Sequence, residues 1–225
     1  MPLALRHRWN LSFEQAVRLQ KQLQSRVRLS PPRGIVRLVA GADVAYDSSG
    51  DTLVAAVVIY RLPGMELEEV VTARDRVRFP YVPGFLSFRE IPAILRAARR
   101  LRARPDLLLC DGQGLAHPRR FGLACHLGLL LDLPSIGVAK SILVGRCREP
   151  GLRRGNRSRL LHRNEVVGWA LRTRSGVRPV YVSPGHRCDL PWAAGKVLSC
   201  CKGFRLPEPV RQAHREVTRL RRRAV

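Results

Sequence analysis

The chain opens with apolar residues at helical spacing and continues with three strand-like runs. The helix is expected to begin after Ser12 and to run to about Val27, and Gln15 stands where a capping-box partner of Ser12 belongs. The three runs span residues 35–46, 52–62 and 67–79. Because only turns rich in Asp, Ser, Gly and Pro separate these runs, the pattern predicts a meander of three antiparallel strands.

A stiff proline-containing loop separates this meander from a second part in which helices and strands alternate. The elements expected there are a helix from Ser87 to about Leu101, a strand over 107–110, a helix over 120–132, a strand over 134–139, an Arg- and Gly-rich surface loop or ribbon over 146–163, a hairpin of 165–173 and 178–183, and closing helices over 189–203 and 207–223. The strand over 107–110 is wholly apolar, which indicates burial on both faces of the sheet, and the strand over 134–139 is expected to be buried as well. We therefore predict an α/β fold with a mixed sheet, in one domain over residues 1–225.

The composition favours a folded chain and excludes several classes of protein. Of the 225 residues, 45% are hydrophobic and 26% are charged, which is typical of a packed domain rather than of a disordered tail. The sequence has no run of about 18 apolar residues and no signal-peptide pattern in its first ten residues, so we expect neither a membrane span nor a signal peptide. The six cysteines have no C-x-x-C spacing and several lie in apolar runs, which favours buried, reduced thiols and a cytoplasmic protein.

Charge changes this picture most. The formal net charge is +24, from 41 basic and 17 acidic residues. Of the basic residues 37 are arginines, whose planar guanidinium binds phosphate through paired hydrogen bonds. A charge of this size predicts a polyanionic partner, most simply a nucleic acid. The alternative is that the arginines reflect coding bias and only cover solvated helix faces.

Three of the few acidic residues stand where a carboxylate needs an explanation. Asp43 lies inside an apolar run, where a buried charge is costly unless it is paired or binds a metal. Asp111 follows the apolar strand 107–110 and opens a Gly-Gln-Gly turn, at the kind of strand end where ligands bind in α/β sheets. Glu90 lies in the first turn of a predicted helix.

Each of these acids also has a purely structural alternative. Asp43 could pair with an arginine, and Asp111 could serve only its turn. Glu90 could complete a capping box with Ser87. Together, however, the three acids favour a metal site, because Mg²⁺ prefers oxygen ligands and is commonly held by one or two carboxylates plus phosphate and water. In a strongly basic chain this combination indicates metal-assisted cleavage of a phosphodiester.

Four segments, in order along the chain, resemble the endonuclease V family. They are 39–46 (VAGADVAY), 80–90 (PYVPGFLSFRE), 111–119 (DGQGLAHPR) and 137–141 (GVAKS). Each segment alone is a weak signal, but their combination is specific, and the resemblance covers most of the chain, about residues 10–215. It implies a ribonuclease H-like fold, in agreement with three antiparallel strands followed by helix–strand alternation.

The resemblance also implies an activity. Members of this family are Mg²⁺-dependent endonucleases that recognise deoxyinosine, the product of adenine deamination, and leave the damaged base in place. Their cut falls at the second phosphodiester bond on the 3′ side of the lesion and gives 3′-hydroxyl and 5′-phosphate ends. We therefore expect a DNA repair enzyme with Mg²⁺ as cofactor, Mn²⁺ as the alternative ion, and damaged single- or double-stranded DNA as partner.

Individual residues match functional positions of the family. The catalytic residues that the resemblance implies are Asp43, Glu90, Asp111, Lys140, His214 and His117, of which Asp43 and Asp111 would bind the metal. Lys140 is expected to meet a phosphate, and His214 to orient the attacking water or to neighbour the metal. The alternatives are an ordinary charge at a strand end for Lys140 and a solvated helix histidine for His214.

A loop and a pocket are implied as well. Tyr81 matches the family's wedge at the lesion, and Pro80 and Pro83 restrict the loop that presents it. An aromatic ring there can stack where the flipped base lay, whereas the alternative is a tyrosine packed in the core. The expected lining of the base pocket is Gly84, Leu86, Gly112, Gly114 and Leu143.

The end of the chain departs from the family pattern. Residues 215–225 are rich in arginine, which predicts a frayed basic helix end that adds non-specific affinity for DNA. Two other functions stay open. One is an enzyme of the same fold that acts on inosine-containing RNA or on branched or mismatched DNA; the other is a non-catalytic, arginine-rich RNA-binding protein, which would need neither the three acids nor Mg²⁺. We expect a monomer with no membrane partner.

Overall fold

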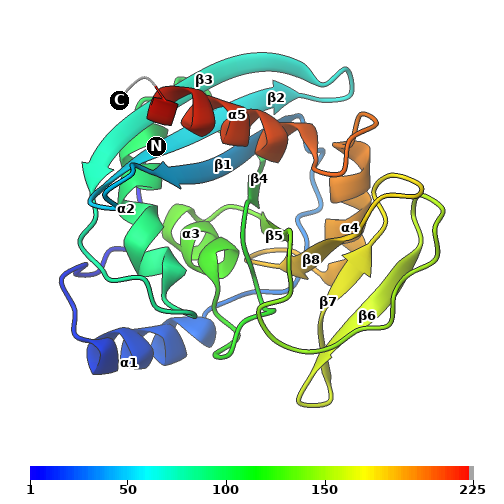
Figure 1. Cartoon of the computed structure of the whole chain (residues 1–225), viewed down its shortest axis with the longest axis horizontal. Helices are drawn as coiled ribbons and strands as arrows, with labels where there is room; N and C mark the ends of the chain where they lie inside the picture. The colour runs from blue at the N-terminus through cyan, green and yellow to red at the C-terminus, as the bar shows by residue number, and fades with distance from the viewer. Residues whose placement is uncertain (223–225) are drawn as a thin grey trace.

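The computed structural model describes residues 1–222, which form an eight-stranded sheet with helices on both faces (Figure 1). The strands are β1 (Leu38–Tyr46), β2 (Thr52–Arg61), β3 (Glu66–Arg76), β4 (Leu107–Cys110), β5 (Ser135–Ala139), β6 (Arg157–His162), β7 (Glu165–Leu171) and β8 (Val180–Pro184). The helices are α1 (Phe13–Gln24), α2 (Leu86–Ala98), α3 (Leu123–Leu131), α4 (Leu190–Ser199) and α5 (Glu208–Arg222). Across the sheet the strands lie in the order β3-β2-β1-β4-β5-β8-β7-β6.

The sheet combines the predicted meander with a parallel centre. Strands β1, β2 and β3 pair antiparallel, with Asp43 opposite Ala56 in the first pair. Strands β1, β4 and β5 run parallel, and β8, β7 and β6 extend the sheet by antiparallel pairing. This mixed sheet, with helices alternating with its later strands, confirms the predicted ribonuclease H-like α/β fold.

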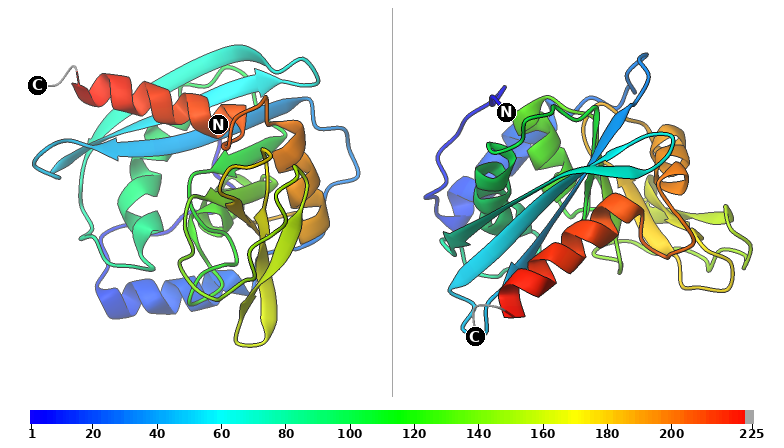
Figure 2. Two further views of the ribbon diagram at one scale, coloured as in Figure 1. Left: turned by 45° about the vertical axis from the view of Figure 1, so that its right-hand side comes forward. Right: turned by 90° about the horizontal axis from the view of Figure 1, so that it is seen from above.

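Helices α2 and α3 cover one face of the sheet, and α4 and α5 cover the other (Figure 2). Successive residues of β1 point to opposite faces, so Ala40 packs in the same core as Ile91 of α2, whereas Val39 shares its core with Val210 of α5. Because both faces are covered, β4 and β5 are buried along their whole length, which confirms the prediction of two short buried strands.

Helix α5 approaches β1 closely at a glycine. A Cβ at Gly41 would lie 2.2 Å from the carbonyl carbon and oxygen of Pro209, so only a residue without a side chain fits there. Pro209 stands in the first turn of α5, where its missing N–H interrupts no helical hydrogen bond. Ala213 and Val217 continue the buried face of α5 over the sheet, and α5 thus holds His214 beside β1.

Two local signals of the sequence had opposite outcomes. The capping box of α1 is confirmed, because the Gln15 N–H donates to Ser12 Oγ (3.3 Å) and the Ser12 N–H donates to Gln15 Oε1 (2.9 Å). The capping box proposed for α2 is wrong, because Phe85 is the N-cap and Ser87 lies inside the first turn. The Ser87 hydroxyl instead lies 3.1 Å from His126 Nδ1 of α3.

The Arg-rich segment and the chain end also refine the predictions. Residues 157–162 form the edge strand β6, so the ribbon interpretation of 146–163 is confirmed. Within the basic end predicted over 215–225, residues up to 222 belong to α5, and Val217 packs on the sheet. The last three residues lie outside the described part of the chain.

Two smaller features complete the fold. The six cysteines are free thiols, and all are buried except the half-buried Cys147, in agreement with the prediction of reduced thiols. Over residues 1–222, no helix is both long enough and apolar enough to cross a membrane.

Candidate active site

Two carboxylates and an imidazole meet where β1, β4 and α5 approach one another. Asp43 lies in β1, and Asp111 directly follows β4. In the parallel pairing of these strands Ala42 lies beside Cys110. The residue that follows each of them in the chain is an aspartate, so Asp43 and Asp111 lie next to each other. His214 comes from α5, and one ligand atom of each of the three side chains lies within 4.8 Å of the others. The structure thus brings the two predicted metal-binding aspartates together and adds His214 to them.

Both aspartates have a basic neighbour. His214 Nδ1 lies 2.7 Å from Asp43 Oδ2, and Lys140 Nζ donates to Asp111 Oδ2 at 2.5 Å. Lys140 follows β5, the next parallel strand, so it reaches the same edge of the sheet as Asp111. The ion-pair partner of Asp43 within the described residues is therefore a histidine and not an arginine, and neither Lys140 nor His214 is a solvated side chain without a partner.

Burial leaves the negative charge of this cluster incompletely compensated. Desolvation, reinforced by the Asp111 carboxylate, raises the pKa of Asp43 to about 6, although His214 opposes the rise. Burial also raises the pKa of Glu90 to about 8, against a hydrogen bond from Tyr46 and with the charges of the two aspartates adding to the rise. Carboxylates whose ionised forms are disfavoured in this way would be stabilised by a divalent cation.

Glu90 contributes its carboxyl from α2, next to the cluster rather than within the set of three close ligand atoms. Its Oε1 accepts a hydrogen bond from the Tyr46 hydroxyl of β1 (2.9 Å), and the side chain is buried. The guanidinium of Arg89 lies over the Tyr46 ring, 4.6 Å from its centroid. Glu90 is therefore positioned by the tertiary fold and not by the helix cap that its spacing to Ser87 indicated.

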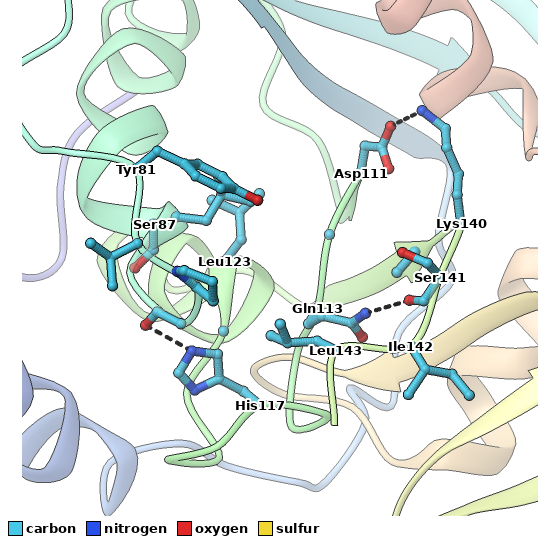
Figure 3. A pocket seen from close by; sticks show the side chains of 17 residues that line it. Tyr81, Ser87, Asp111, Gln113, His117, Leu123, Lys140, Ser141, Ile142 and Leu143 are labelled. Atoms are coloured by element: carbon cyan, nitrogen blue, oxygen red, sulfur yellow. Dashed lines mark hydrogen bonds and ion pairs between the residues drawn. The ribbon is translucent and has the colours of Figure 1, made fainter. Parts of the chain in front are cut away.

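A cavity of about 350 Å³ opens beside the cluster (Figure 3). Four segments line it: the loop that leads into α2 with the first turn of that helix, the turn after β4, the start of α3, and the residues that follow β5. Asp111 and Lys140 belong both to the lining of this cavity and to the charged cluster. The cavity and the cluster are therefore one continuous site.

The structure places most of the predicted pocket residues in this lining. Gly84, Leu86, Gly112 and Leu143 line the cavity, as do Tyr81 and Pro83, whereas Pro80 and Gly114 do not. Gly114 packs instead against β8, where a Cβ would lie 2.0 Å from the carbonyl oxygen of Pro184, so close backbone packing explains this glycine. Tyr81 is 70% exposed, which contradicts the alternative of a tyrosine packed in the core.

His117 lies at the far end of the cavity from the carboxylates (Figure 3). It is buried, its Nε2 lies 2.9 Å from the Gly84 carbonyl oxygen, and burial lowers its pKa to about 4. The Arg119 guanidinium donates to the same carbonyl at 2.7 Å. These two side chains hold Gly84, whose φ of 84° favours glycine, and so shape the cavity wall.

Two further residues of the site were not predicted as site residues from the sequence: Arg119 and Gln113. The Gln113 amide nitrogen donates to the Ser141 carbonyl oxygen (2.9 Å), which links the turn after β4 to the segment after β5. Its Oε1 is buried and has no hydrogen-bond partner among the described residues. Both residues lie in the segment 111–119 that carries the family resemblance, and Gln113 also stands between two glycines of the predicted pocket.

Known proteins resemble this chain along most of its length. A sequence model of the family described as Endonuclease V matches residues 20–215. The endonuclease V of Gloeobacter violaceus is 53% identical over 212 residues, which cover 92% of this chain and 86% of that protein. The crystal structure of the Streptomyces avermitilis endonuclease V has a TM-score of 0.91 and 45% identity, covering 96% of both chains. The endonuclease V of Ciona intestinalis, in complex with a DNA that contains an inosine followed by a ribo-adenosine, has a TM-score of 0.84 and 29% identity over 96% of this chain and 100% of that one. The chain therefore belongs to the endonuclease V family.

Proposed function

We propose that this nuclease recognises deoxyinosine in DNA and hydrolyses the second phosphodiester bond on its 3′ side, leaving 3′-hydroxyl and 5′-phosphate ends. The observation that carries the proposal is the continuity of the Asp43–Asp111–His214 cluster with a cavity of about 350 Å³, in a chain of charge +24. A cavity of this size is sufficient for one small ligand such as a flipped base. The complex of the Ciona homologue with inosine-containing DNA supports the same substrate class.

The donor set of the cluster fits a divalent cation. Asp43 and Asp111 supply carboxylate oxygens, which suit Mg²⁺ and also Mn²⁺, and His214 stands beside them. The raised pKa of Asp43 is further support, because burial and, after it, the charge of Asp111 disfavour the ionised form, which a cation would stabilise. A bound ion would supply Lewis-acid polarisation of a phosphate oxygen and acidify a water molecule.

The side chains of the protein would do the rest. Lys140, whose Nζ lies beside Asp111 Oδ2 and whose side chain belongs to the cavity lining, would stabilise the negative charge that accumulates on the scissile phosphate. His214 keeps Nδ1 on Asp43, which leaves Nε2 to orient the attacking water. Glu90 and its partner Tyr46 would keep a third carboxyl near the ion or its water.

The cavity would select the base. Hypoxanthine carries a hydrogen on ring nitrogen N1 where adenine has none, and the unpartnered Oε1 of Gln113 is an acceptor in the cavity wall. An unsatisfied buried acceptor favours the ligand that offers a donor. Tyr81, exposed between two prolines, would stack in the space that the flipped base leaves.

A gel assay tests the proposal. A labelled duplex with one deoxyinosine is incubated with Mg²⁺ or with chelator, beside an undamaged duplex. We expect a Mg²⁺-dependent nick at the second bond, which Asp43→Asn and Asp111→Asn abolish and the exposed Asp51→Asn leaves unchanged. Cleavage by Asp43→Asn at the parent rate would refute the assignment of the metal site.

The second candidate substrate is RNA. In the Ciona complex a ribo-adenosine follows the inosine, so ribose is present in that substrate next to the lesion. Matched inosine oligonucleotides of DNA and RNA differ only in the sugar and in the thymine methyl group, and their cleavage rates, measured side by side, separate the two functions. If the protein binds both oligonucleotides tightly and in a salt-sensitive way but cleaves neither, the result would favour a non-catalytic nucleic-acid-binding protein.

A further inference from the structure

The loop between α4 and α5 presents an exposed aromatic ring beside the active site. Phe204 lies in this loop with 47% of its surface exposed. The guanidinium of Arg211, on α5, lies over the ring with 4.2 Å to its centroid. An exposed ring with a cation on one face is a surface on which a nucleobase can stack.

The position of Arg211 is fixed by a buried acid. Glu208 is buried in the first turn of α5, and its carboxylate accepts hydrogen bonds from Arg211 Nε at 3.1 Å and from Arg211 Nη2 at 2.5 Å. This pair neutralises the one acid in the segment 202–215, which also carries Lys202, Arg205 and Arg215. The surroundings of the ring therefore remain positively charged and complementary to a phosphate chain.

One hydrogen bond and one helical spacing place this loop next to the charged cluster. Arg205 Nη2 donates to the carbonyl oxygen of Lys140 (2.8 Å), the residue whose amine binds Asp111. Arg211 stands three residues before His214 on α5, so both lie on one side of the helix, and His214 binds Asp43. In Figure 3, His117 lies on one side of Asp111. Lys140 lies on the other side, with its amine beside the faint ribbon of α5.

We propose that Phe204 and Arg211 form a stacking shelf for the nucleotide immediately 3′ to the bond that is cut. A strand whose damaged base occupies the cavity must pass the cluster at its scissile phosphate, and it then leaves toward α5. The first base beyond the cluster meets the exposed face of Phe204. This inference rests on the proposed function for the position of the cut, and it assigns a binding role to a loop outside the cavity.

Binding measured with and without that base tests the shelf. Deoxyinosine oligonucleotides carry either a normal nucleotide or an abasic residue at the second position 3′ to the inosine, and fluorescence anisotropy in chelator gives their Kd values. For the parent protein we expect the abasic residue to weaken binding roughly 5- to 100-fold, as loss of one base–aromatic stack does. Phe204→Ala should bind the normal oligonucleotide about as weakly as the parent protein binds the abasic one. The abasic residue should cause no further loss of affinity in this variant.

Two variants complete the design. Phe204→Trp keeps a stacking ring and should retain the parent's response, whereas Ile35→Ala, which truncates an exposed side chain at 80% exposure outside the site, should behave as the parent. The shelf is refuted if the parent does not respond to the abasic residue, or if Phe204→Ala responds as strongly as the parent. Because binding is measured without cleavage, failure of the shelf is distinguishable from failure of the proposed function, which the nicking of the normal oligonucleotide in Mg²⁺ reports.

Discussion

Replacing Gly41 by alanine tests whether the close approach of α5 to β1 assembles the active site. The new Cβ would lie 2.2 Å from the carbonyl carbon and oxygen of Pro209, whereas ordinary contacts begin at 3.4 Å. The first turn of α5 must therefore move by about 1.2 Å, because backbone atoms cannot rotate away as a side-chain end can. A rigid shift of that size would lengthen the 2.7 Å contact between His214 and Asp43 beyond hydrogen-bonding distance.

The magnitude follows from known effects of overpacking. Forcing an extra carbon into a filled interior costs about 1–3 kcal/mol of unfolding free energy. For a chain of this size each kcal/mol lowers the melting temperature by about 2–4 °C, so we expect Gly41→Ala to melt roughly 2 to 12 °C below the parent. The variant should also cleave deoxyinosine DNA more slowly at temperatures where it is fully folded, since the imidazole no longer holds its place on Asp43.

Thermal unfolding and single-turnover cleavage, measured on the same preparations, check both effects. The matched control is Gly195→Ala in α4, because no described atom lies within 4 Å of the Cβ it adds. Alanine at that exposed helical position should stabilise the protein by about 0.5–1 kcal/mol and leave cleavage unchanged. If Gly41→Ala unfolds and cleaves like Gly195→Ala, the approach of α5 is not what sets the cluster.

Three further outcomes are expected. Lys140→Met should lower the single-turnover cleavage rate by about 10²–10³-fold with little change in melting temperature, and a change below tenfold would contradict its role at the phosphate. Burial holds the pKa of His126 well below its ordinary value of 6.5, so the unfolded chain binds a proton there that the folded chain does not. Stability, measured by urea unfolding, should therefore fall as pH drops below about 6.5, by up to about 1.4 kcal/mol per pH unit for this proton, and His126→Gln should flatten that dependence. Deleting residues 219–225 should reduce the salt dependence of DNA binding and leave the preference for deoxyinosine intact, and an unchanged salt dependence would contradict a phosphate-binding role for this end.

The sequence predicts the strands better than their ends. β4 and β5 are recognisable because their runs are short and largely apolar, which matches burial on both faces. β1 begins at Leu38 and not at residue 35, because the N–H groups of Arg37 and Leu38 are taken by the Asp106 carboxylate and Ile35 stays exposed. β6 could be foreseen only as a loop or ribbon, since most of its side chains face solvent and its backbone pairing with β7 leaves no apolar pattern.

The start of α2 illustrates why a local motif can mislead. Ser87 and Glu90 have capping-box spacing, yet both side chains interact with residues that are distant in the sequence. The Ser87 hydroxyl lies beside His126 of α3, and Glu90 accepts a hydrogen bond from Tyr46 of β1. A four-residue pattern carries no information on such contacts, so the same letters that cap α1 serve the core and the active site in α2.

The active site likewise has one part that the sequence predicts and one part that depends on tertiary packing. Parallel pairing of β1, β4 and β5 brings Asp43, Asp111 and Lys140 to one edge of the sheet, and strand order alone is enough to anticipate their meeting. His214 joins them from α5, 171 residues beyond Asp43 in the sequence. No pattern of apolar residues predicts that these two side chains meet in space. Their meeting depends on the absence of a side chain at Gly41, which lets α5 lie close to β1. This effect is visible only once the helix is packed on the sheet. The part of the site that follows from strand topology is therefore readable in one sequence, whereas the part that follows from packing between layers became predictable only through the resemblance to a family.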